Sequence, residues 1–364
     1  MLVTRRQKRG AEVSAANLSR QLQVMGHTVI WVGLYQPSTN ILEVTEVITK
    51  DLDGRDDLFF SCKKFRHLLH LVKQYKVDII QANGSDTLRY AVAVAFLNPY
   101  IKLVYRNISK VSYWINGSFI KKMYNRLLFS RVTAIASVGT NSANDLSSTL
   151  KIPQNRIKVI RRGIPLQVIN KVTVRQKITN ELSIPVEAFI LVWIGELAFE
   201  KNPLFMIDVM VELQRRNINC YLVMTGKGKE ESNILEAIKK YRLQNVQLTG
   251  YRSDAVEILA AADLLVLTSY VEGVPGVVLE AAMQQIPAVA VNKGGVGEAV
   301  IDGKTGILID DHNVEFFSDA VEKLIKDENL RKKMGQYAYN WVKEEFDEKQ
   351  NAEAFSKLYQ AITE

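Results

Sequence analysis

The chain has 364 residues, more than the roughly 100–200 of an ordinary single domain, so we expect two domains. Its 47% of hydrophobic and 24% of charged residues exclude the disordered and collagen-like classes. No apolar run reaches the roughly 18–20 residues of a membrane span, and the distant Cys62 and Cys220 cannot form a disulfide framework. We therefore expect a globular protein of the reducing cytoplasm, and the four histidines favour no metal site.

The net charge of +8 is distributed unevenly along the chain. Residues 1–165 contain 25 lysines and arginines against 10 aspartates and glutamates, whereas residues 166–364 contain 22 against 29. The first part therefore has a surplus of 15 positive charges and the second a deficit of 7. Such asymmetry indicates that the first part meets an anionic surface or substrate, although a merely solvated basic face would give the same count.

Both halves alternate short β-rich runs with helical patterns, which is typical of parallel sheets built from βαβ units. The strands expected in the first half are 1–4, 29–33, 77–81, 101–105, 132–137 and 157–160. The first is shorter than the roughly five or six residues of a buried strand, which leaves open a clipped strand or a start further upstream. Residues 163–188 contain Pro165 and Pro185, lack a regular pattern and are expected to be a linker.

The pattern then restarts. The strands expected in the second half are 189–194, 220–225, 246–248, 264–267, 288–291 and 306–309. Three helical stretches follow at 314–326, 330–345 and 349–362. This order predicts a first domain over 1–165, a linker over 166–188, a second domain over 189–345, and a C-terminal helix over 346–364 that packs back toward the first domain. Ligands of such folds bind at the carboxyl ends of the strands.

The residues that carry chemistry concentrate after the expected strand 264–267. Glu272 lies in the loop after this strand, and Glu280 lies about one turn into the next helix. Between them, Gly273 and Gly276 allow a sharp turn with exposed N–H groups near the positive end of that helix. Helix N-termini favour acidic residues in any case, but Glu280 is set among apolar residues, where a carboxylate needs a partner. Two carboxylates so placed can accept hydrogen bonds from sugar and ribose hydroxyl groups.

This region resembles the family 4 glycosyltransferases, whose E-x7-E pattern is reproduced by Glu272 and Glu280. Further blocks similar to that family lie at 195–202, 249–254, 261–263, 272–275, 279–283, 287–290, 294–298 and 302–306, with weaker matches at 9–12, 26–29 and 78–82. These are retaining enzymes of the GT-B fold. The resemblance therefore implies an α/β architecture of two Rossmann-like, doubly wound parallel-sheet domains that face a central cleft.

The resemblance also implies roles for matched residues. Glu280 would hold the ribose hydroxyls of the nucleotide, and Glu272 would lie near the donor sugar and the reaction centre. The other positions implied to bind the donor are Gly10, Lys201, Gly273, Val274, Pro275, Gly276 and Val277. Because a lysine and a helix end would neutralise the diphosphate, no metal or other cofactor is expected.

Several positions depart from the family pattern. Glu196 occupies the place of an arginine that usually accompanies Lys201, and its charge would repel a diphosphate. Either Glu196 points away, or Arg252 or Arg106 supplies the missing cation. The family also has a histidine at the end of the fourth strand, where this chain has Arg106 and Asn107, so these two are the candidate supporting catalytic residues.

Residues 111–131 interleave aromatic and basic side chains on a helical pattern, which is typical of a segment that lies in a membrane interface. An ordinary crossover helix, with Ile120, Met123 and Leu127 facing the sheet, would show the same pattern. The residues predicted to contact a membrane or the acceptor are Arg5, Arg6, Arg9, Trp114, Lys121 and Lys122. Nucleic acid is not an expected partner, because the basic residues show no repeat or nucleic-acid motif.

The sequence therefore predicts a glycosyltransferase that moves a sugar from a nucleotide-sugar donor to a hydroxyl of a glycan or lipid-linked acceptor. The donor is predicted to be a UDP-sugar, with GDP as the other option, and the pathway to be cell-surface polysaccharide biosynthesis. The expected location is the cytoplasm, peripheral on the inner face of an anionic membrane. The alternative is a sugar-nucleotide-binding or partner-activated subunit with little transfer activity of its own, which Glu196 and the missing histidine favour.

Overall fold

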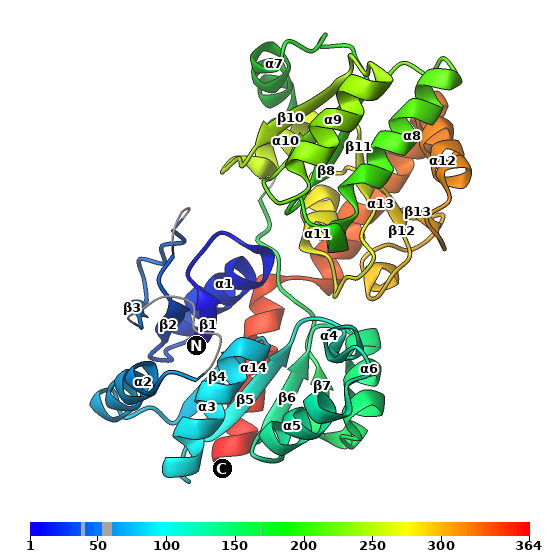
Figure 1. Ribbon diagram of the computed structural model, residues 1–364. Coiled ribbons are helices and arrows are strands. Elements are labelled where there is room, and N and C mark those ends of the chain that lie inside the picture. The colour runs from blue at the N-terminus through cyan, green and yellow to red at the C-terminus, as the bar shows by residue number, and fades with distance from the viewer. Residues whose placement is uncertain (38–40, 53–59, 168) are drawn as a thin grey trace. The chain divides into compact units, whose positions relative to one another are not determined.

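The computed structural model describes residues 1–37, 41–52, 60–167 and 169–364, and it contains two compact units (Figure 1). Met1–Pro165 and Phe346–Glu364 form the first unit, and Leu166–Glu345 form the second. The second unit is therefore inserted, in sequence, between the two segments of the first. Each unit is an α/β fold with its own parallel sheet, as the alternating strand and helix patterns predict.

Within the described residues, the first unit contains a seven-stranded parallel sheet in the order β3-β2-β1-β4-β5-β6-β7. Its strands are β1 (Leu2–Arg5), β2 (Ile30–Tyr35), β3 (Ile48–Asp51), β4 (Ile79–Asn83), β5 (Lys102–Asn107), β6 (Ala134–Ser137) and β7 (Ile157–Val159). The strand order changes direction at β1, as in doubly wound sheets. Leu103, Val104 and Tyr105 of β5 are all buried, because both faces of the sheet are covered.

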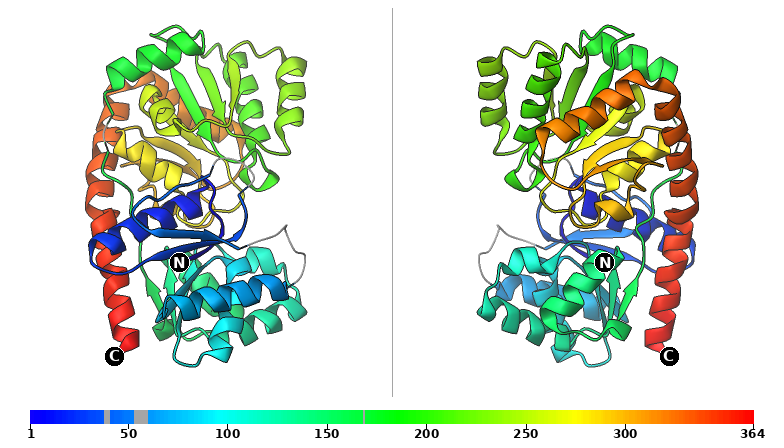
Figure 2. Two further views of the ribbon diagram at one scale, coloured as in Figure 1. Left: turned by 90° about the vertical axis from the view of Figure 1, so that its left-hand side faces the viewer. Right: turned by 90° about the vertical axis from the view of Figure 1, so that its right-hand side faces the viewer.

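Two groups of helices cover the two faces of this sheet. The helices are α1 (Gly10–Val24), α2 (Cys62–Gln74), α3 (Ser85–Leu97), α4 (Val111–Ile115), α5 (Phe119–Ser130), α6 (Thr140–Leu150) and α14 (Glu348–Thr363), with a 3-10 turn at Gln154–Arg156. Helices α2, α3, α5 and α6 share a core cluster with Leu103, whereas Leu18 of α1 and Phe355 of α14 share another with Val104. Since neighbouring residues of a strand point to opposite faces, α1 and α14 cover one face together, as Figure 2 shows in blue and red.

The second unit contains, within the described residues, a six-stranded parallel sheet in the order β10-β9-β8-β11-β12-β13. Its strands are β8 (Ile190–Ile194), β9 (Tyr221–Thr225), β10 (Val246–Gly250), β11 (Leu264–Leu267), β12 (Ala288–Val291) and β13 (Gly306–Ile309). Its helices are α7 (Lys171–Glu181), α8 (Pro203–Arg215), α9 (Glu231–Tyr241), α10 (Ala255–Ala261), α11 (Gly276–Met283), α12 (Val314–Lys326) and α13 (Glu328–Glu345), with 3-10 turns at Phe199–Lys201 and Val296–Glu298. Across both units, every described helix is too short or too polar to span a lipid bilayer.

The expectation of a linker over residues 166–188 is wrong, because this segment belongs to the second unit and contains α7. Helix α7 packs against α10, and its Ile178 is buried. The guanidinium of Arg175 donates hydrogen bonds to the carbonyl oxygens of Ala188 at 2.6 Å and Ala261 at 2.9 Å. It also pairs with Asp263 at 3.1 Å. Packing of Ile178 and the hydrogen bonds of Arg175 thus fix a segment whose low hydrophobicity resembles that of a linker.

Two elements of the first unit differ from the sequence prediction. Strand β3 was missed because it lies at the sheet edge, where exposed and half-buried residues alternate and no apolar run forms. The expected helix over 111–131 is divided into α4 and α5. Asn116 and Gly117 break it with φ angles of 47° and 70°, in the left-handed region that ends a helix.

Candidate functional site

The polar residues expected to bind the donor lie on loops at the carboxyl end of the second sheet. Lys201 ends the 3-10 turn after β8, and Glu272 lies in the loop between β11 and α11. The Nζ of Lys201 is 2.5 Å from Oε1 of Glu272, and the hydroxyl of Ser269 donates to the same oxygen at 2.7 Å. The structure therefore brings together two predicted residues that are far apart in sequence.

The end of β11 holds the backbone around Lys201 in place. The buried hydroxyl of Thr268 faces the carbonyl oxygens of Lys201 and Asn202 at 3.0 and 2.9 Å, and it accepts a hydrogen bond from the indole N–H of Trp193 at 3.1 Å. The carbonyl oxygen of Thr268 lies 2.8 Å from Nε2 of His312. Neither Thr268 nor His312 belongs to a motif of its own, so neither was predicted from the sequence.

Glycines allow a second loop to lie directly on the Glu272 backbone. A Cβ atom at Gly294 would come within 2.0 Å of the Glu272 carbonyl oxygen, and one at Gly295 within 2.4 Å of the Gly273 carbonyl oxygen. The N–H of Gly295 donates to the carbonyl of Glu272 at 3.1 Å. Any side chain at either glycine would displace the loop that carries Glu272.

The remaining donor positions lie at the N-terminus of α11. They are Gly273, Val274, Pro275, Gly276 and Val277, of which Val274 and Pro275 are buried. The first N–H groups of a helix have no acceptor within the helix, and the helix dipole places partial positive charge there. Glu280 lies one turn further along α11 and is half-buried. This turn has the features of an anion-binding helix end with a carboxylate beside it.

Arg252 is held by two carboxylates of its own unit. Its guanidinium donates to Asp254 at 2.8 and 2.7 Å and to Glu181 at 3.0 Å. Hydrogen bonds to these two carboxylates raise the pKa of Arg252. A role of Arg252 at a diphosphate would require these pairs to be exchanged, so its assignment to the donor stays a prediction. Glu196 is exposed.

Sequence reasoning did not single out Lys227, which lies in the loop after β9. A Cβ atom at Gly226 would come within 1.7 Å of the Gly195 carbonyl oxygen, and one at Gly228 within 2.2 Å of the Leu197 carbonyl oxygen. This loop therefore lies against the loop after β8, and its Lys227 side chain is exposed. The signal in the sequence was two glycines that flank a lysine directly after a strand.

In the first unit, Arg106 lies at the end of β5 and is only 1% exposed. Its Nη2 donates to the hydroxyl of Ser14 at 2.8 Å, and its guanidinium carbon lies 5.6 Å from the centre of the Phe355 ring. Its Nε has no hydrogen-bond partner, and no carboxylate of the described residues pairs with it. Burial, and then the nearby charge of Arg162, lower the pKa of Arg106 to about 10. The first unit thus contains a buried cation without a counter-ion.

Asn107, the other candidate catalytic residue, is also buried. Its amide Nδ2 donates to the carbonyl of Ser142 at 2.9 Å and to the hydroxyl of Ser137 at 3.3 Å. These contacts connect β5 to β6 and α6, which is a structural role that the sequence did not predict. Its catalytic role stays a prediction.

The start of α1 contains the remaining predicted residues of the first unit. Gly10 begins the helix, and open space surrounds the position where its Cβ would lie, so its backbone is accessible. Arg6 forms a two-bond ion pair with Asp51, with Nε to Oδ1 at 2.7 Å, so this cation is already neutralised. Arg5 lies over the Tyr35 ring at 5.3 Å, and Arg9 is exposed.

Glu12, which the sequence analysis did not single out, lies in the first turn of α1. Burial raises the pKa of Glu12 to about 7, although the nearby Arg9 and Arg5 oppose this shift. A half-buried carboxylate next to the accessible Gly10 can therefore hold a proton near neutral pH. Among the described residues, no group of three or more histidine, cysteine, aspartate or glutamate side chains is placed to bind a metal ion.

Two family profiles match the chain and together cover most of it. The profile described as Glycosyltransferase Family 4 matches residues 8–168, and that described as Glycosyl transferases group 1 matches residues 174–341. The chain belongs to the family 4 glycosyltransferases. This family 4 chain is 25% identical, over 269 residues, to an uncharacterised glycosyltransferase of Methanocaldococcus jannaschii. The matched region is 73% of the chain and 66% of that protein.

Other relatives match shorter parts. The chain is 32% identical over 152 residues to the alpha-D-kanosaminyltransferase of Streptomyces kanamyceticus. These residues are 41% of the chain and 39% of that enzyme. The chain therefore spans less than two thirds of the length of these two relatives. Among solved structures, Anabaena HepE in complex with UDP and glucose matches with a TM-score of 0.86 and 17% identity, over 99% of this chain and 98% of that one. The prediction of the GT-B fold is confirmed.

Proposed function

We propose that this family 4 glycosyltransferase transfers a sugar from a UDP-sugar to a hydroxyl group of a glycan or lipid-linked acceptor, with retention of the anomeric configuration. The observation that carries the proposal is the Lys201–Glu272 pair beside the N-terminus of α11, at the carboxyl end of the second sheet. A cation and free helix N–H groups suit a diphosphate, and two carboxylates suit sugar and ribose hydroxyls. The likeness to a protein solved with UDP and glucose supports UDP as the nucleotide.

In the proposed reaction, the bond between the anomeric carbon and the phosphate oxygen breaks. The acceptor oxygen bonds to the same face of the sugar, and its proton passes to the leaving phosphate. Lys201 and the N–H groups of α11 stabilise the charge that develops on the diphosphate, so no metal is required. Glu280 accepts hydrogen bonds from the ribose hydroxyls. The exposed Lys227 supplies the positive charge that is missing because Glu196 replaces the arginine of the family pattern.

The further parts of the proposal are the biological setting and the location. Cell-surface polysaccharide biosynthesis fits a family 4 enzyme with a glycan or lipid-linked acceptor. The surplus of 15 positive charges in residues 1–165 supports peripheral association with the anionic inner face of a membrane, in the cytoplasm. A second candidate is a nucleotide-sugar-binding or partner-activated subunit with little activity, which the exposed Glu196 near this site favours.

The experiment that tests the function measures release of UDP from a panel of UDP-sugars, with GDP-sugars as the comparison. Wild type is expected to release UDP, and Glu280→Ala is expected to bind UDP weakly and to lose most of this activity. The matched control is Glu236→Ala, on the exposed face of α9 in the same unit, which should keep the wild-type rate. Donor binding without release or transfer would favour the second candidate, and absence of binding would contradict both.

A further inference from the structure

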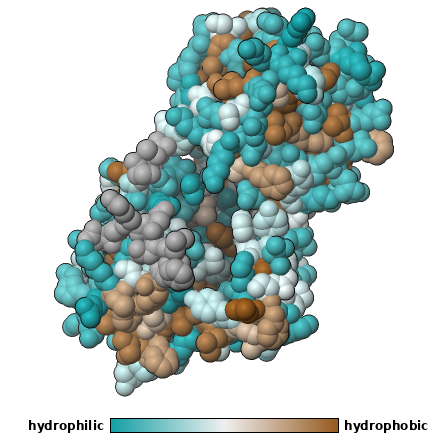
Figure 3. Space-filling view, viewed as in Figure 1, coloured by the Kyte–Doolittle hydropathy of each residue, from teal (hydrophilic) through white to brown (hydrophobic). Residues whose placement is uncertain are grey.

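Large apolar side chains lie outside the core on one face of the first unit. We define the α5 face by Trp114 of α4 and by Phe119, Ile120, Met123, Tyr124 and Leu127 of α5, all of which are exposed. The exposure of Phe119, Ile120 and Leu127 reaches 72, 80 and 71%. In Figure 3 hydrophobic residues gather over the part of this unit that Figure 1 labels α3 and α5. Exposed apolar surface of this extent marks an interaction site.

The apolar stripe of α5 faces away from the core. Ile120, Met123, Tyr124 and Leu127 follow the spacing i, i+3, i+4, i+7 and therefore form one stripe. Phe129 is the buried residue of this helix, and it lies two positions, or about 200° of helix rotation, beyond Leu127. The stripe thus lies opposite the side that packs on the sheet. The interpretation of 111–131 as a crossover helix whose apolar residues face the sheet is wrong.

The surroundings of the stripe are basic. Residues 87–144 contain eight lysines and arginines and no aspartate or glutamate. On α5 itself, Lys121 and Arg126 flank the stripe on its two sides, whereas Lys122 follows Ile120 by about 200° of helix rotation and lies on the side of Phe129. An apolar stripe flanked by cations fits a surface that offers acyl chains and phosphates together.

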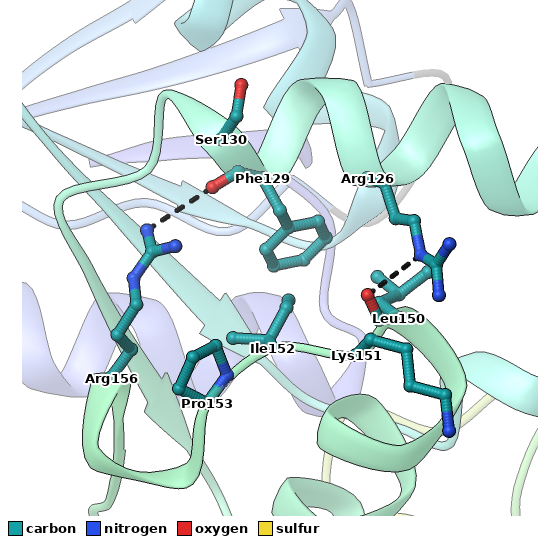
Figure 4. A pocket seen from close by; sticks show the side chains of 8 residues that line it. All are labelled: Arg126, Phe129, Ser130, Leu150, Lys151, Ile152, Pro153 and Arg156. Carbon is teal, nitrogen blue, oxygen red and sulfur yellow. Dashed lines mark hydrogen bonds between the residues drawn. The ribbon is translucent and has the colours of Figure 1, made fainter.

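A basic hollow of about 380 Å³ adjoins α5 at its C-terminal end. Its cations are Arg126, Lys151 and Arg156, and Figure 4 shows the two arginines on opposite sides of the Phe129 ring. Nε of Arg126 donates to the carbonyl of Leu150 at 3.0 Å, which fixes this guanidinium at the rim. The lining contains no carboxylate. The hollow therefore extends the positive charge beyond α5.

We propose that the α5 face docks on a bilayer that contains anionic phospholipid, with α5 lying in the plane of the interface. Ile120 and Leu127 enter the acyl boundary, Trp114 lies at the level of the headgroups, and Lys121 and Arg126 meet the phosphates. A second copy of the chain is disfavoured on this face, because a symmetric contact would bring the same cations together. The inference deepens the proposed membrane association and does not depend on the transfer chemistry.

Sedimentation with vesicles of phosphatidylglycerol and phosphatidylcholine, compared with pure phosphatidylcholine, tests the α5 face. Wild type is expected to bind the anionic vesicles, and less at 1 M salt, where the screening length falls to about 3 Å. Ile120→Ser with Leu127→Ser should lower the partition coefficient roughly tenfold or more. The matched control is Leu235→Ser with Phe316→Ser, two exposed apolar residues of the second unit, which should bind as wild type does.

The basic part of the face is tested by Lys121→Glu with Arg126→Glu, which should abolish most of the salt-sensitive binding. Lys333→Glu with Lys343→Glu, two exposed lysines of α13, makes the same change in net charge and should bind as wild type does. Equal binding to both vesicle types, or unchanged binding of the Ile120 and Leu127 variant, would overturn the proposal. A concentration-dependent dimer that this variant abolishes in analytical ultracentrifugation would assign the face to a second copy instead.

The same Ile120 and Leu127 variant separates this inference from the proposed function. Its release of UDP from a soluble donor without vesicles should equal that of wild type, because both side chains lie outside the candidate site. Loss of vesicle binding with full UDP release supports the docking face. Intact vesicle binding in a protein that releases no UDP would contradict the proposed function and leave the docking face supported.

Discussion

The candidate donor site of the second unit and the end of β5 in the first unit differ in whether carboxylates compensate their cations. At the carboxyl end of the second sheet, Lys201 pairs with Glu272, and Arg252 pairs with Glu181 and Asp254. In the first unit, by contrast, Arg106 is buried without a carboxylate partner. The cations Lys201 and Arg252 of the second unit are therefore neutralised internally, whereas the buried Arg106 of the first unit, unlike the paired Arg6, has no compensating carboxylate among the described residues.

This difference indicates how each unit would respond to a bound anion. A cation that already has a carboxylate partner binds an anion only by exchanging one partner for another. A buried cation without a partner lowers stability until an anion arrives. The comparison therefore makes opposite predictions for removal of charge in the two units.

The largest expected effect is that of Lys201→Met. Loss of the cation proposed to stabilise the leaving diphosphate should lower kcat/KM for UDP release about a hundredfold to a thousandfold. Steady-state kinetics measure this, and Lys333→Met on α13 is the control that removes one exposed lysine of the same unit. A fall of less than about threefold would show that the paired cation of the second unit does not act on the leaving group.

A smaller effect is expected for Glu12→Gln. Because the pKa of Glu12 is raised to about 7, the folded protein keeps this proton to higher pH than the unfolded chain does. Ionisation therefore costs stability as the pH rises from about 4.5 to 7, by at most about 3 kcal/mol. Urea unfolding should find the variant more stable than wild type at pH 8 and equal to it near pH 4.5. An advantage that does not change with pH would contradict the shifted pKa.

The smallest effect is expected for Arg106→Met. Replacing a buried, uncompensated cation by an apolar side chain of similar length should raise the free energy of unfolding by about 1 kcal/mol. Urea unfolding at pH 7 measures this, with the exposed Lys158→Met on β7 as a control that should change little. A less stable variant would show that the Ser14 hydrogen bond and the Phe355 contact outweigh the cost of the buried charge.

The sequence predicted those parts of the fold that depend on apolar periodicity. Buried strands such as β11 and β12 are continuous apolar runs, and they lie where the pattern predicts them. Strand β3 and helix α7 were missed, because an edge strand has no apolar run and α7 has a polar sequence that hydrogen bonds of Arg175 help to fix. Glu272 was identified from the E-x7-E pattern and Lys201 from a separate block, and their direct contact required the structure.

Other features of the candidate site had no sequence signal of their own. The pKa of Glu12 depends on burial, and burial of a side chain in the first turn of a helix depends on tertiary packing. The orientation of the α5 stripe was also open, because periodicity gives the stripe but not the direction it faces. Exposure of Ile120 and Leu127 decided that question.

The division of the first unit into two chain segments has a consequence for the order of biosynthesis. Phe355 of α14 belongs to the cluster that covers one face of the first sheet, and it is translated after the whole second unit. While the ribosome makes residues 166–345, the apolar face around Val104 and Trp31 therefore lacks α14. During this period the nascent first unit has an incompletely covered apolar face. Such exposed surface is prone to aggregation and is bound by chaperones.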